Sequence, residues 1–364
     1  MKRKQVVVAM SGGVDSSVAA AVLKEKGYEV IGITMNLFSL PKKLCRSDEL
    51  KSCCGWRAME DAHRVAIRLG IQHFVVDFRR EFEGTVIRDF CREYSLGRTP
   101  NPCIRCNEHV KFRLLLDRAK RLGADYVASG HHARVVFSRS SKRCLLKKGK
   151  DKAKDQSYFL YPLTQEQLSR TLMPVGNLTK GEVRQMAKAW NLPVAEKPES
   201  QEICFVPGGR YPEFLRKQIP QAFLPGPVQD TSGRVLGEHK GIIHFTVGQR
   251  RGMRIAAAHP LYVVSIDREK NTIVVGTHND LYQKKLLASQ INLISLEKLG
   301  QPVQVKAKIR YRHDEAKALV TPLSPHQVLV EFENPQRAVT PGQSVVFYER
   351  DVVVGGGIID KAFD

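Results

Sequence analysis

A short apolar strand pattern runs directly into a loop of glycines and hydroxyl residues, and this junction constrains the fold most strongly. Gln5–Met10 is typical of a buried strand, SGGVDSS (residues 11–17) follows it, and Ser16–Lys26 has helical apolar spacing. Glycines allow a tight turn that points N–H groups inward, and hydroxyls with a helix N-terminus complete an anion cradle. The junction predicts a βα unit with a phosphate-binding loop other than the G-x-x-x-x-G-K-[ST] P-loop.

Strand and helix patterns go on alternating through the first half of the chain. Such alternation indicates βαβ units and a parallel sheet, hence an α/β fold. The segment 96–108, with two prolines and two cysteines, is expected to be a loop, and Ser138–Asp155 a lysine-rich connection. A T-x-x-E capping box at Thr179 and Glu182 predicts a helix to about Trp190. The other expected strands are Glu29–Met35, His73–Asp77 and Asp125–Ser129, and the other expected helices Trp56–Leu69, Glu81–Tyr94 and His109–Leu122.

The pattern changes after Phe205, where prolines and glycines interrupt the chain and short strands follow. Leu261–Ile266 and Thr272–Gly276 flank a hairpin turn. Later strands at regular spacing suggest a small barrel or sandwich. We therefore place one domain boundary near 205–210 and another near 280. The later strands are expected at Val303–Tyr311, Lys317–Thr321, Gln327–Phe332, Ser344–Tyr348 and Val352–Ile359.

The chain is strongly basic, with 58 Lys+Arg against 37 Asp+Glu, a formal charge of +21. Residues 101–150 hold 13 Lys+Arg and 3 Asp+Glu, so about half of the excess lies in one segment. A localised basic stripe is the electrostatic footprint of a nucleic-acid binder. Composition alone supports a solvated basic surface equally well.

Hydropathy and cysteine use point to the cytoplasm. No apolar run approaches the roughly 18 residues of a membrane span, and the N-terminal apolar stretch is too short for a signal peptide. In a reducing compartment, clustered cysteines indicate catalysis or metal binding rather than structural disulfides. Cys103 and Cys106 form such a C-x-x-C pair, and Cys204 lies well downstream. No second pair follows at zinc-finger spacing.

SGHHARV (residues 129–135) follows a predicted strand, at the end of a sheet where ligands bind in open α/β folds. Read alone, His131 and His132 are ordinary histidines near a hairpin, and no carboxylate cluster accompanies them to hold a metal. The charged segment Lys150–Gln156, read alone, is a solvated surface.

Together these motifs identify a family. The SGGVDSS loop resembles the pyrophosphate-binding loop of PP-loop, or N-type, ATP pyrophosphatases. The whole chain is identified as a member of the tRNA-specific 2-thiouridylase MnmA family, because its matches run in order along almost its full length. They are SGGVDSS (11–17), NPCIRCN (101–107), SGHHARV (129–135), KDQSYFL (154–160), ESQEICFV (199–206), GEHKGIIHFTVGQRRG (237–252), KIRYR (308–312) and PGQSVVFY (341–348).

The resemblance implies three domains: a PP-loop ATP pyrophosphatase catalytic domain over 1–205, a small central tRNA-binding domain over 206–280 and a C-terminal β-barrel over 281–364. It implies a tRNA-uridine 2-sulfurtransferase that adenylates O2 of the wobble uridine with ATP and Mg²⁺. Sulfur from a cysteine persulfide then replaces that oxygen at C2, giving 2-thiouridine, AMP and pyrophosphate. The implied partners are the tRNA anticodon region and a sulfur donor, either a cysteine desulfurase or a sulfur-carrier protein.

Site residues follow by motif. Cys106 matches the nucleophile and Cys204 the persulfide-bearing cysteine. The expected ATP-binding residues are Ala9, Met10, Ser11, Gly12, Gly13, Val14, Asp15, Ser16, Met35 and Gly130. Asn101, Pro102 and Cys103 would meet the target base. The expected tRNA contacts are His131, Lys154, Asp155, Gln156, Arg310, Tyr311 and Gln343. This expectation replaces the interpretation of His131 as an ordinary histidine and of residues 150–156 as a solvated surface.

Cys103 departs from the pattern of many family members, which have Asp at this position. A thiol is a poorer proton shuttle than a carboxylate but a better metal ligand. Three readings stay open: persulfide transfer between Cys204 and Cys106, a [4Fe-4S] cluster on Cys103, Cys106 and Cys204 with one open iron, and a structural zinc. The first needs no additional cofactor.

Two other classes compete with thiolation. A small-molecule PP-loop adenylating ligase would also use the SGGVDSS loop, but it needs neither the cysteines nor the basic stripe. A non-enzymatic tRNA-binding protein would bind tRNA without releasing AMP, and the loop argues against it.

Overall fold

The computed structural model describes residues 3–38, 55–198, 203–206, 211–253 and 255–364. Its contacts divide the chain into two compact units. Unit 1 comprises residues 1–87, 103–209 and 351–353, and unit 2 comprises residues 88–102, 210–350 and 354–364. The cysteines Cys45, Cys53 and Cys54 and the first four residues of ESQEICFV lie outside the described residues.

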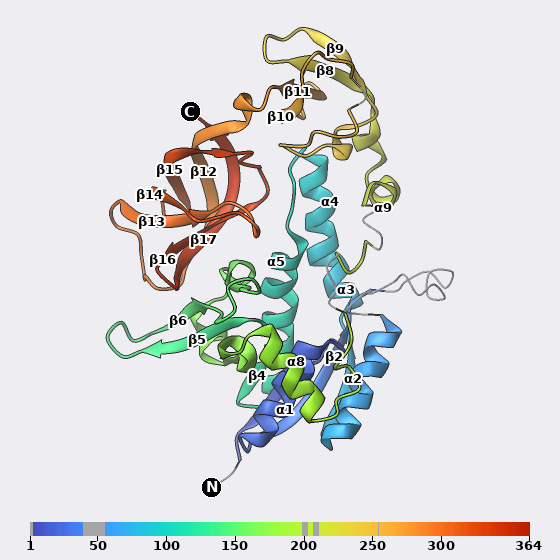
Figure 1. Cartoon of the computed structure of the whole chain (residues 1–364), viewed down its shortest axis with the longest axis vertical. Coiled ribbons are helices and arrows are strands. Elements are labelled where there is room, and N and C mark those ends of the chain that lie inside the picture. Colours follow the sequence, from blue (N-terminus) through green and yellow to red (C-terminus); the bar gives the residue numbers. More distant parts are fainter. Residues whose placement is uncertain (1–2, 39–54, 199–202, 207–210, 254) are drawn as a thin grey trace. The chain divides into compact units, whose positions relative to one another are not determined.

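Unit 1 is built on a parallel sheet with the strand order β3-β2-β1-β4-β7 in the described part of the chain. Figure 1 labels β2 and β4 of this sheet. The chain first adds β2 and β3 on one side of β1, then returns to place β4 on the other side. The strand order therefore reverses between β1 and β4, which is where open parallel sheets bind ligands. The strands are β1 (Gln5–Ala9), β2 (Glu29–Asn36), β3 (Gln72–Asp77), β4 (Tyr126–Ala128) and β7 (Thr171–Leu172).

The core of this sheet comes from β1 and three helices, α1 (Val14–Glu25), α2 (Trp56–Leu69) and α8 (Lys180–Ala189). Val6 and Val8 are fully buried against Val18 of α1 and Val183 of α8. A strand buried on both faces carries a continuous apolar run rather than an alternating one, and VVVA in β1 has that pattern. The core therefore holds the start of α1 at the end of β1.

The predicted connection over Ser138–Asp155 is wrong in part. β5 (Ala133–Ser138) and β6 (Arg143–Lys148) form an antiparallel hairpin around a short turn. Cys144 and Leu146 are buried on β6, so the lysine-rich composition concealed an alternating strand pattern. Short elements follow the hairpin: η4 (Ser157–Leu160), α7 (Gln165–Ser169) and η5 (Pro174–Asn177).

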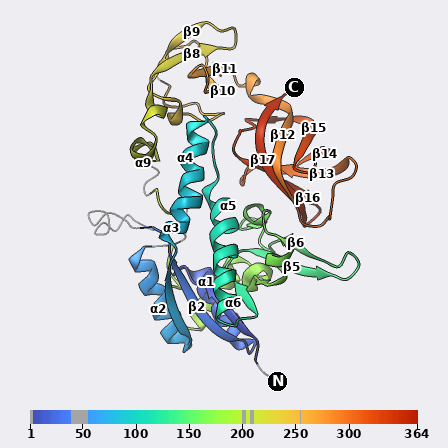
Figure 2. The ribbon, with the colours of Figure 1, turned by 180° about the vertical axis from the view of Figure 1, so that it is seen from behind.

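The expected loop over 96–108 is also wrong in part. α5 (Pro102–Cys106), η3 (Asn107–Leu114) and α6 (Leu115–Arg121) adjoin and form one rod in Figure 2. Pro102 is at the first helical position, where a proline starts a helix rather than breaking it. The helix predicted over Glu81–Tyr94 is confirmed, with a π-helical segment inside it: α3 (Arg79–Phe82), η2 (Glu83–Ile87) and α4 (Arg88–Ser95).

Unit 2 contains a small four-stranded sheet, in the described residues, with the order β10-β11-β8-β9. The hairpin predicted around residues 267–271 is confirmed as β10 (Tyr262–Asp267) and β11 (Thr272–Gly276). β8 (Gly226–Asp230) and β9 (Val235–His239) were not predicted. The helical pieces of this part are α9 (Tyr211–Gln218), η7 (Pro220–Phe223), η8 (Ile242–His244) and η9 (Asn279–Leu281).

The C-terminal strands of unit 2 close into a barrel, because β12 pairs with both β15 and β17. Its buried interior includes Phe332, Phe347 and Ile359. The predicted α/β class is confirmed: a parallel-sheet domain, a small central domain and a C-terminal β-barrel. The barrel strands are β12 (Tyr282–Leu293), β13 (Val303–Lys308), β14 (Ala316–Ser324), β15 (Gln327–Arg337), β16 (Ser344–Glu349) and β17 (Val352–Phe363).

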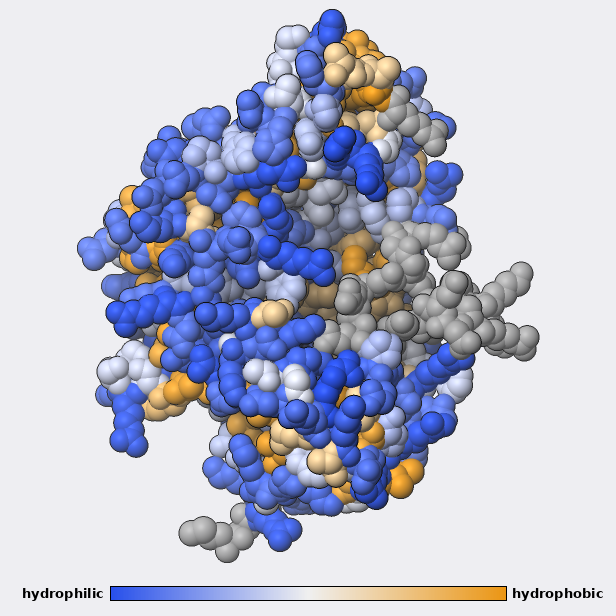
Figure 3. All heavy atoms as spheres, viewed as in Figure 1, coloured by the Kyte–Doolittle hydropathy of each residue, from blue (hydrophilic) through white to orange (hydrophobic). Residues whose placement is uncertain are grey.

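Hydrophilic side chains dominate the face shown in Figure 3. In the described part of the chain, no helix combines the length and apolar character needed to cross a bilayer.

The predicted capping box at the start of α8 is confirmed. The Glu182 N–H donates to Thr179 Oγ1 over 3.3 Å, and the Thr179 N–H donates to Glu182 Oε2 over 2.6 Å. Replacing Thr179 by Ala removes one half of this pair. We expect Thr179→Ala to lower the free energy of unfolding by about 1 kcal/mol, measured by urea denaturation. Thr179→Ser keeps the hydroxyl and is the control. Equal midpoints for the Ala and Ser variants would contradict the prediction.

Candidate functional site

The SGGVDSS loop leaves the N-terminus of α1 open. Gly13 is the N-cap residue, and no side chain caps the helix there. Ser16 Oγ accepts the Ser11 N–H over 3.2 Å, and the Ser17 hydroxyl donates to Gly13 O over 2.9 Å. These internal bonds fix the loop, and a helix N-terminus without a side-chain cap is suited to binding an anion.

Gly130 brings the end of β4 against this loop. A Cβ atom at Gly130 would lie 2.5 Å from the Ser16 nitrogen and 2.6 Å from the Asp15 carbonyl carbon. Only a residue without a side chain permits that approach. The structure therefore brings the loop and Gly130 together at the edge where β1 and β4 are neighbours.

The other predicted nucleotide-binding residues lie at the ends of β1 and β2. The Thr34 hydroxyl donates to Met10 O over 2.7 Å, and the Met10 N–H donates to Ile33 O over 2.9 Å. Met10 and Met35 are buried. Ala9 to Ser16, Met35 and Gly130 thus belong to one contiguous part of unit 1.

Asp15 is the centre of a charged cluster that the sequence analysis did not find. Lys180 Nζ lies 2.7 Å from each carboxylate oxygen of Asp15, and His132 Nε2 lies 3.3 Å from Oδ1. Lys180 and His132 are both buried. His132 Nδ1 is buried without a hydrogen-bond partner among the described residues.

Burial raises the pKa of Asp15, but the hydrogen bond from His132 and the charge and hydrogen bond of Lys180 together outweigh it. The pKa of this carboxyl therefore lies below its usual value of 3.8. The group is ionised at neutral pH, and a negative charge stands in a loop that is suited to binding anions. Lys180 compensates that charge in the described structure.

A second lysine contacts the loop from downstream. Lys197 Nζ donates to Gly12 O over 2.9 Å and to Asp61 Oδ2 over 2.5 Å. Lys197 lies seven residues before Cys204 in the sequence. No local pattern in the sequence marks Lys197 or Asp61.

His131 and the 154–156 segment lie near the same strand end. Burial, followed by the nearby charge of Lys111, lowers the pKa of His131 to about 3, so its imidazole is neutral at physiological pH. The Ser129 Oγ atom lies 2.9 Å from His131 Nδ1. Gln156 Oε1 accepts the His132 N–H over 2.9 Å, and the Gln156 N–H donates to His132 O.

Asp155 does not belong to a solvated surface. Its side chain is buried and accepts the Gly149 N–H over 3.0 Å and the Ser157 hydroxyl over 2.8 Å. It fixes the turn that carries Lys154 and Gln156.

The predicted catalytic cysteines lie on two segments of unit 1. Cys103 is exposed and Cys106 is buried, one helical turn apart on α5. Cys204 is half-buried in a short turn, where the Val206 N–H donates to Ile203 O over 3.0 Å. The Phe205 ring anchors this turn edge-on against Phe82, 5.5 Å between centroids.

No group of three His, Cys, Asp or Glu residues is arranged to hold a metal ion in the part of the chain that the structure describes. The single carboxylate of Asp15 is enough for a Mg²⁺ site of the usual kind, because Mg²⁺ typically takes one or two carboxylates together with substrate phosphate oxygens.

The remaining predicted residues lie in unit 2. Asn101 ends the irregular segment between α4 and α5, and Pro102 is the first residue of α5. Arg310 Nη1 donates to Arg337 O over 3.0 Å, and Tyr311 lies under Lys308 Nζ, 5.8 Å from the ring centroid. Gln343 bonds to backbone within its own unit.

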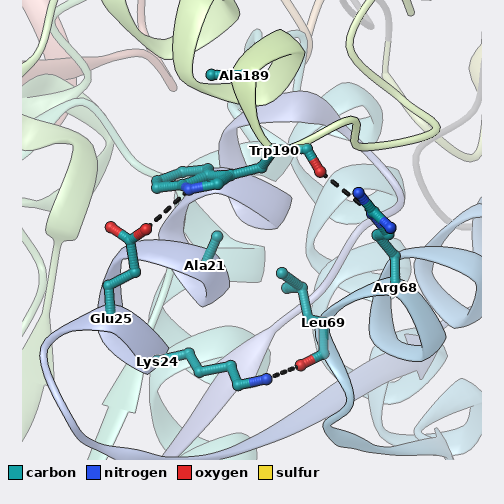
Figure 4. A pocket seen from close by; sticks show the side chains of 7 residues that line it. All are labelled: Ala21, Lys24, Glu25, Arg68, Leu69, Ala189 and Trp190. Carbon is teal, nitrogen blue, oxygen red and sulfur yellow. Dashed lines mark hydrogen bonds between the residues drawn. The ribbon is translucent and has the colours of Figure 1, made fainter.

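A surface pocket of about 450 Å³ lies elsewhere, at the C-terminal end of α1 (Figure 4). Its polar groups are already paired: Trp190 Nε1 donates to Glu25, Arg68 to Trp190 O, and Lys24 to Leu69 O. Lys24 is ten residues from Val14, about 15 Å along the helix. This pocket is therefore not the phosphate-binding site.

Family models match three consecutive parts of the chain. They are described as a tRNA methyl transferase HUP domain over residues 4–208, a tRNA methyl transferase PRC-barrel domain over 212–277 and an aminomethyltransferase beta-barrel domain over 283–359. Among solved structures, a 4-thiouridine synthetase in complex with RNA and bound ATP covers 60% of this chain and 51% of its own, at 18% identity and a TM-score of 0.35.

Curated relatives match at much higher identity. A tRNA-specific 2-thiouridylase MnmA of Halothermothrix orenii is 53% identical over 359 residues, covering 99% of each chain. The protein of the same name from Acetivibrio thermocellus is also 53% identical over 359 residues, covering 99% of this chain and all of its own. The chain belongs to the tRNA-specific 2-thiouridylase MnmA family.

Proposed function

We propose that this protein is a tRNA-uridine 2-sulfurtransferase that acts on the wobble uridine. The observation that carries the proposal is the open N-terminus of α1 against Gly130, at the reversal of the sheet, in a chain of this family. That geometry suits a nucleotide polyphosphate. The 2-thiouridylase names of the full-length relatives supply the substrate class.

The first step is adenylation. Uridine O2 attacks the α-phosphorus of ATP, the bond from that phosphorus to the bridging β-phosphate oxygen breaks, and pyrophosphate leaves. The N–H groups of the loop hold the leaving phosphates, and Lys180 and Lys197 supply positive charge beside them. Mg²⁺ bound with ATP would neutralise phosphate charge, with Asp15 as the carboxylate suited to it.

The second step transfers sulfur. The terminal sulfur of a Cys204 persulfide attacks C2, the C2–O2 bond breaks, and AMP leaves. The Cys106 thiolate then attacks the Cys204 sulfur, which leaves one sulfur on C2 and forms a Cys106–Cys204 disulfide. A dithiol reductant returns both cysteines to thiols. Cys103, which is exposed one helical turn before Cys106, either assists this sulfur transfer or takes no part in it.

The tRNA would lie along basic surface. Residues 134–154 hold nine Lys or Arg and one Asp, and Arg139, Lys142 and Lys152 are exposed. Arg and Lys on such a surface neutralise phosphates with little sequence preference. Asn101 and Pro102 would meet the target base, and His131, Lys154, Gln156, Arg310 and Tyr311 the surrounding nucleotides. Because the Asp155 carboxylate is buried, its role would be to shape the turn that presents Lys154.

We assign catalysis to the domain over residues 1–205 and tRNA binding to the small central domain over 206–280. The C-terminal β-barrel domain is assigned to residues 281–364. The sulfur donor would be a cysteine desulfurase or a sulfur carrier. The cytoplasm, where thiols stay reduced, suits this chemistry.

Cysteine variants test the function. With ATP, tRNA and a persulfide donor, we expect Cys106→Ser and Cys204→Ser to lose 2-thiouridine formation, measured by mass spectrometry of nucleosides. Pyrophosphate release should persist in both variants and should require tRNA, because adenylation precedes sulfur transfer. Cys144→Ser, at a buried position on β6, is the control and should thiolate normally.

Full thiolation by either cysteine variant would overturn the sulfur mechanism. Pyrophosphate release that depends on a small acid and not on tRNA would favour a PP-loop ligase. Binding of tRNA without any pyrophosphate or AMP would favour a non-enzymatic binding protein.

Lys180 offers a test of the ATP site. Lys180→Met leaves the Asp15 carboxylate uncompensated beside the polyphosphate, so we expect the KM for ATP to rise about tenfold or more, with tRNA affinity unchanged. Lys188→Met on the same helix removes only an exposed ion pair with Glu196 and should leave that KM unchanged. An unchanged KM for ATP in Lys180→Met would contradict the role.

Iron content separates the two sulfur chemistries. Protein purified without oxygen should hold no iron or acid-labile sulfide and should still thiolate tRNA from a persulfide donor, because persulfide transfer between Cys204 and Cys106 needs no additional cofactor. About four of each per chain, lost in Cys103→Ala, would instead establish a [4Fe-4S] carrier on Cys103, Cys106 and Cys204.

A further inference from the structure

The irregular segment Arg98–Asn101, between α4 and α5, is held by the barrel within unit 2. The Thr99 N–H donates to Pro341 O over 2.9 Å. Gln343 Nε2 donates to Thr99 O over 2.9 Å and to Pro100 O over 3.3 Å. Irregular backbone needs partners for its polar groups, and here one turn, Pro341–Gln343, supplies them to two consecutive residues.

A second anchor holds the same segment. Arg98 Nη2 donates to Ile359 O over 3.2 Å, and Arg98 Nε lies 2.7 Å from Glu93 Oε2. Ile359 O also accepts the Gly342 N–H over 2.9 Å, and the Ile359 N–H donates to Gln343 O over 2.8 Å. The turn, strand β17 and Arg98 therefore form one hydrogen-bonded network.

Gly342 lets the turn reach the segment. Its φ of +89° lies in the left-handed region, and a Cβ there would be 2.9 Å from both the nitrogen and the oxygen of Thr99. A side chain at this position would push Thr99 away from Pro341.

We propose that Gln343 and Gly342 are positioning residues: they fix Thr99–Pro100 and thereby set Asn101 and Pro102 where the target uridine is met. This inference rests on the proposed function. It gives Gln343 a role besides the predicted tRNA contact, because its amide nitrogen donates to two protein carbonyls. Among the described residues none donates to Gln343 Oε1, so that oxygen can still accept from RNA.

The experiment compares Gln343→Met, Gly342→Ala and Gly233→Ala. Gln343→Met keeps the length of the side chain and removes its donor, and Gly342→Ala inserts a methyl group against Thr99. Gly233→Ala is the control in the same unit, since its φ is +90° and a Cβ there meets nothing within 4 Å. The first readout is hydrogen exchange at Thr99, which requires no activity. The second is the single-turnover rate of thiolation at saturating tRNA, beside the Kd for tRNA.

We expect faster exchange at Thr99 in both test variants, a rate at least about tenfold lower, and a Kd for tRNA within about threefold of the wild-type value, since small misplacements of reacting groups are costly. The control should match the wild type. Unchanged hydrogen exchange at Thr99 in both variants would show that the turn Pro341–Gln343 does not hold the segment. Faster exchange at Thr99 with an unchanged thiolation rate would overturn the positioning role. A higher Kd for tRNA in Gln343→Met alone, with an unchanged thiolation rate in Gly342→Ala, would mean that Gln343 contacts tRNA and does not position the segment.

Failure of the proposed function has a different signature. Wild-type protein would then show no tRNA-dependent pyrophosphate release or thiolation, and no rate comparison could support the positioning role. Hydrogen exchange at Thr99 would still decide whether the turn clamps the segment.

Discussion

Parallel pairing of β1 with both β2 and β4 is the constraint on which the site depends. It aligns the carboxyl ends of three strands at one edge of the sheet, so that the SGGVDSS loop, Met35 and Gly130 meet there although they are far apart in the sequence. The buried apolar strand β1 and the core around α1 keep that edge rigid. A loop that offers backbone N–H groups to an anion needs such rigidity, because each N–H must already point at the ligand when it arrives.

In this basic molecule, the negative charge of Asp15 is balanced by side chains directly beside it. An anion cradle that contains its own carboxylate, Asp15, would repel phosphate unless cations stood beside it. Lys180 supplies one, although a lysine in the first turn of a helix opposes the helix dipole. The ion pair between Lys180 and Asp15 explains why a lysine stands at this unfavourable helix position. Residues that are locally disfavoured often mark functional or strained sites.

Local patterns predicted much of the fold and some of the site. β1, α1 and the Thr179 cap follow from apolar spacing and capping chemistry, which act over a few residues. The errors arise where two local signals conflict: the segment 96–108 with its two prolines was predicted to be a loop, although Pro102 starts a helix, and the lysines of β6 concealed its buried Cys144 and Leu146. Contacts between distant residues left no pattern to read. Lys180 contacts Asp15 across 165 residues of sequence, so this pair could not be found from periodicity.

The last strand also limits how this protein can be divided. β17 begins at Val352, which pairs with Lys147 of β6, and Asp351 just before it lies 2.9 Å from Arg134 and 3.1 Å from Lys147. Residues 351–353 therefore complete the parallel-sheet unit, although the strand goes on to close the barrel. A fragment that ends before the barrel would lose a strand partner and the anion that two cations share. Recombination between relatives at the linear domain borders would exchange part of the parallel-sheet unit together with the barrel, so the two are expected to be inherited as one module.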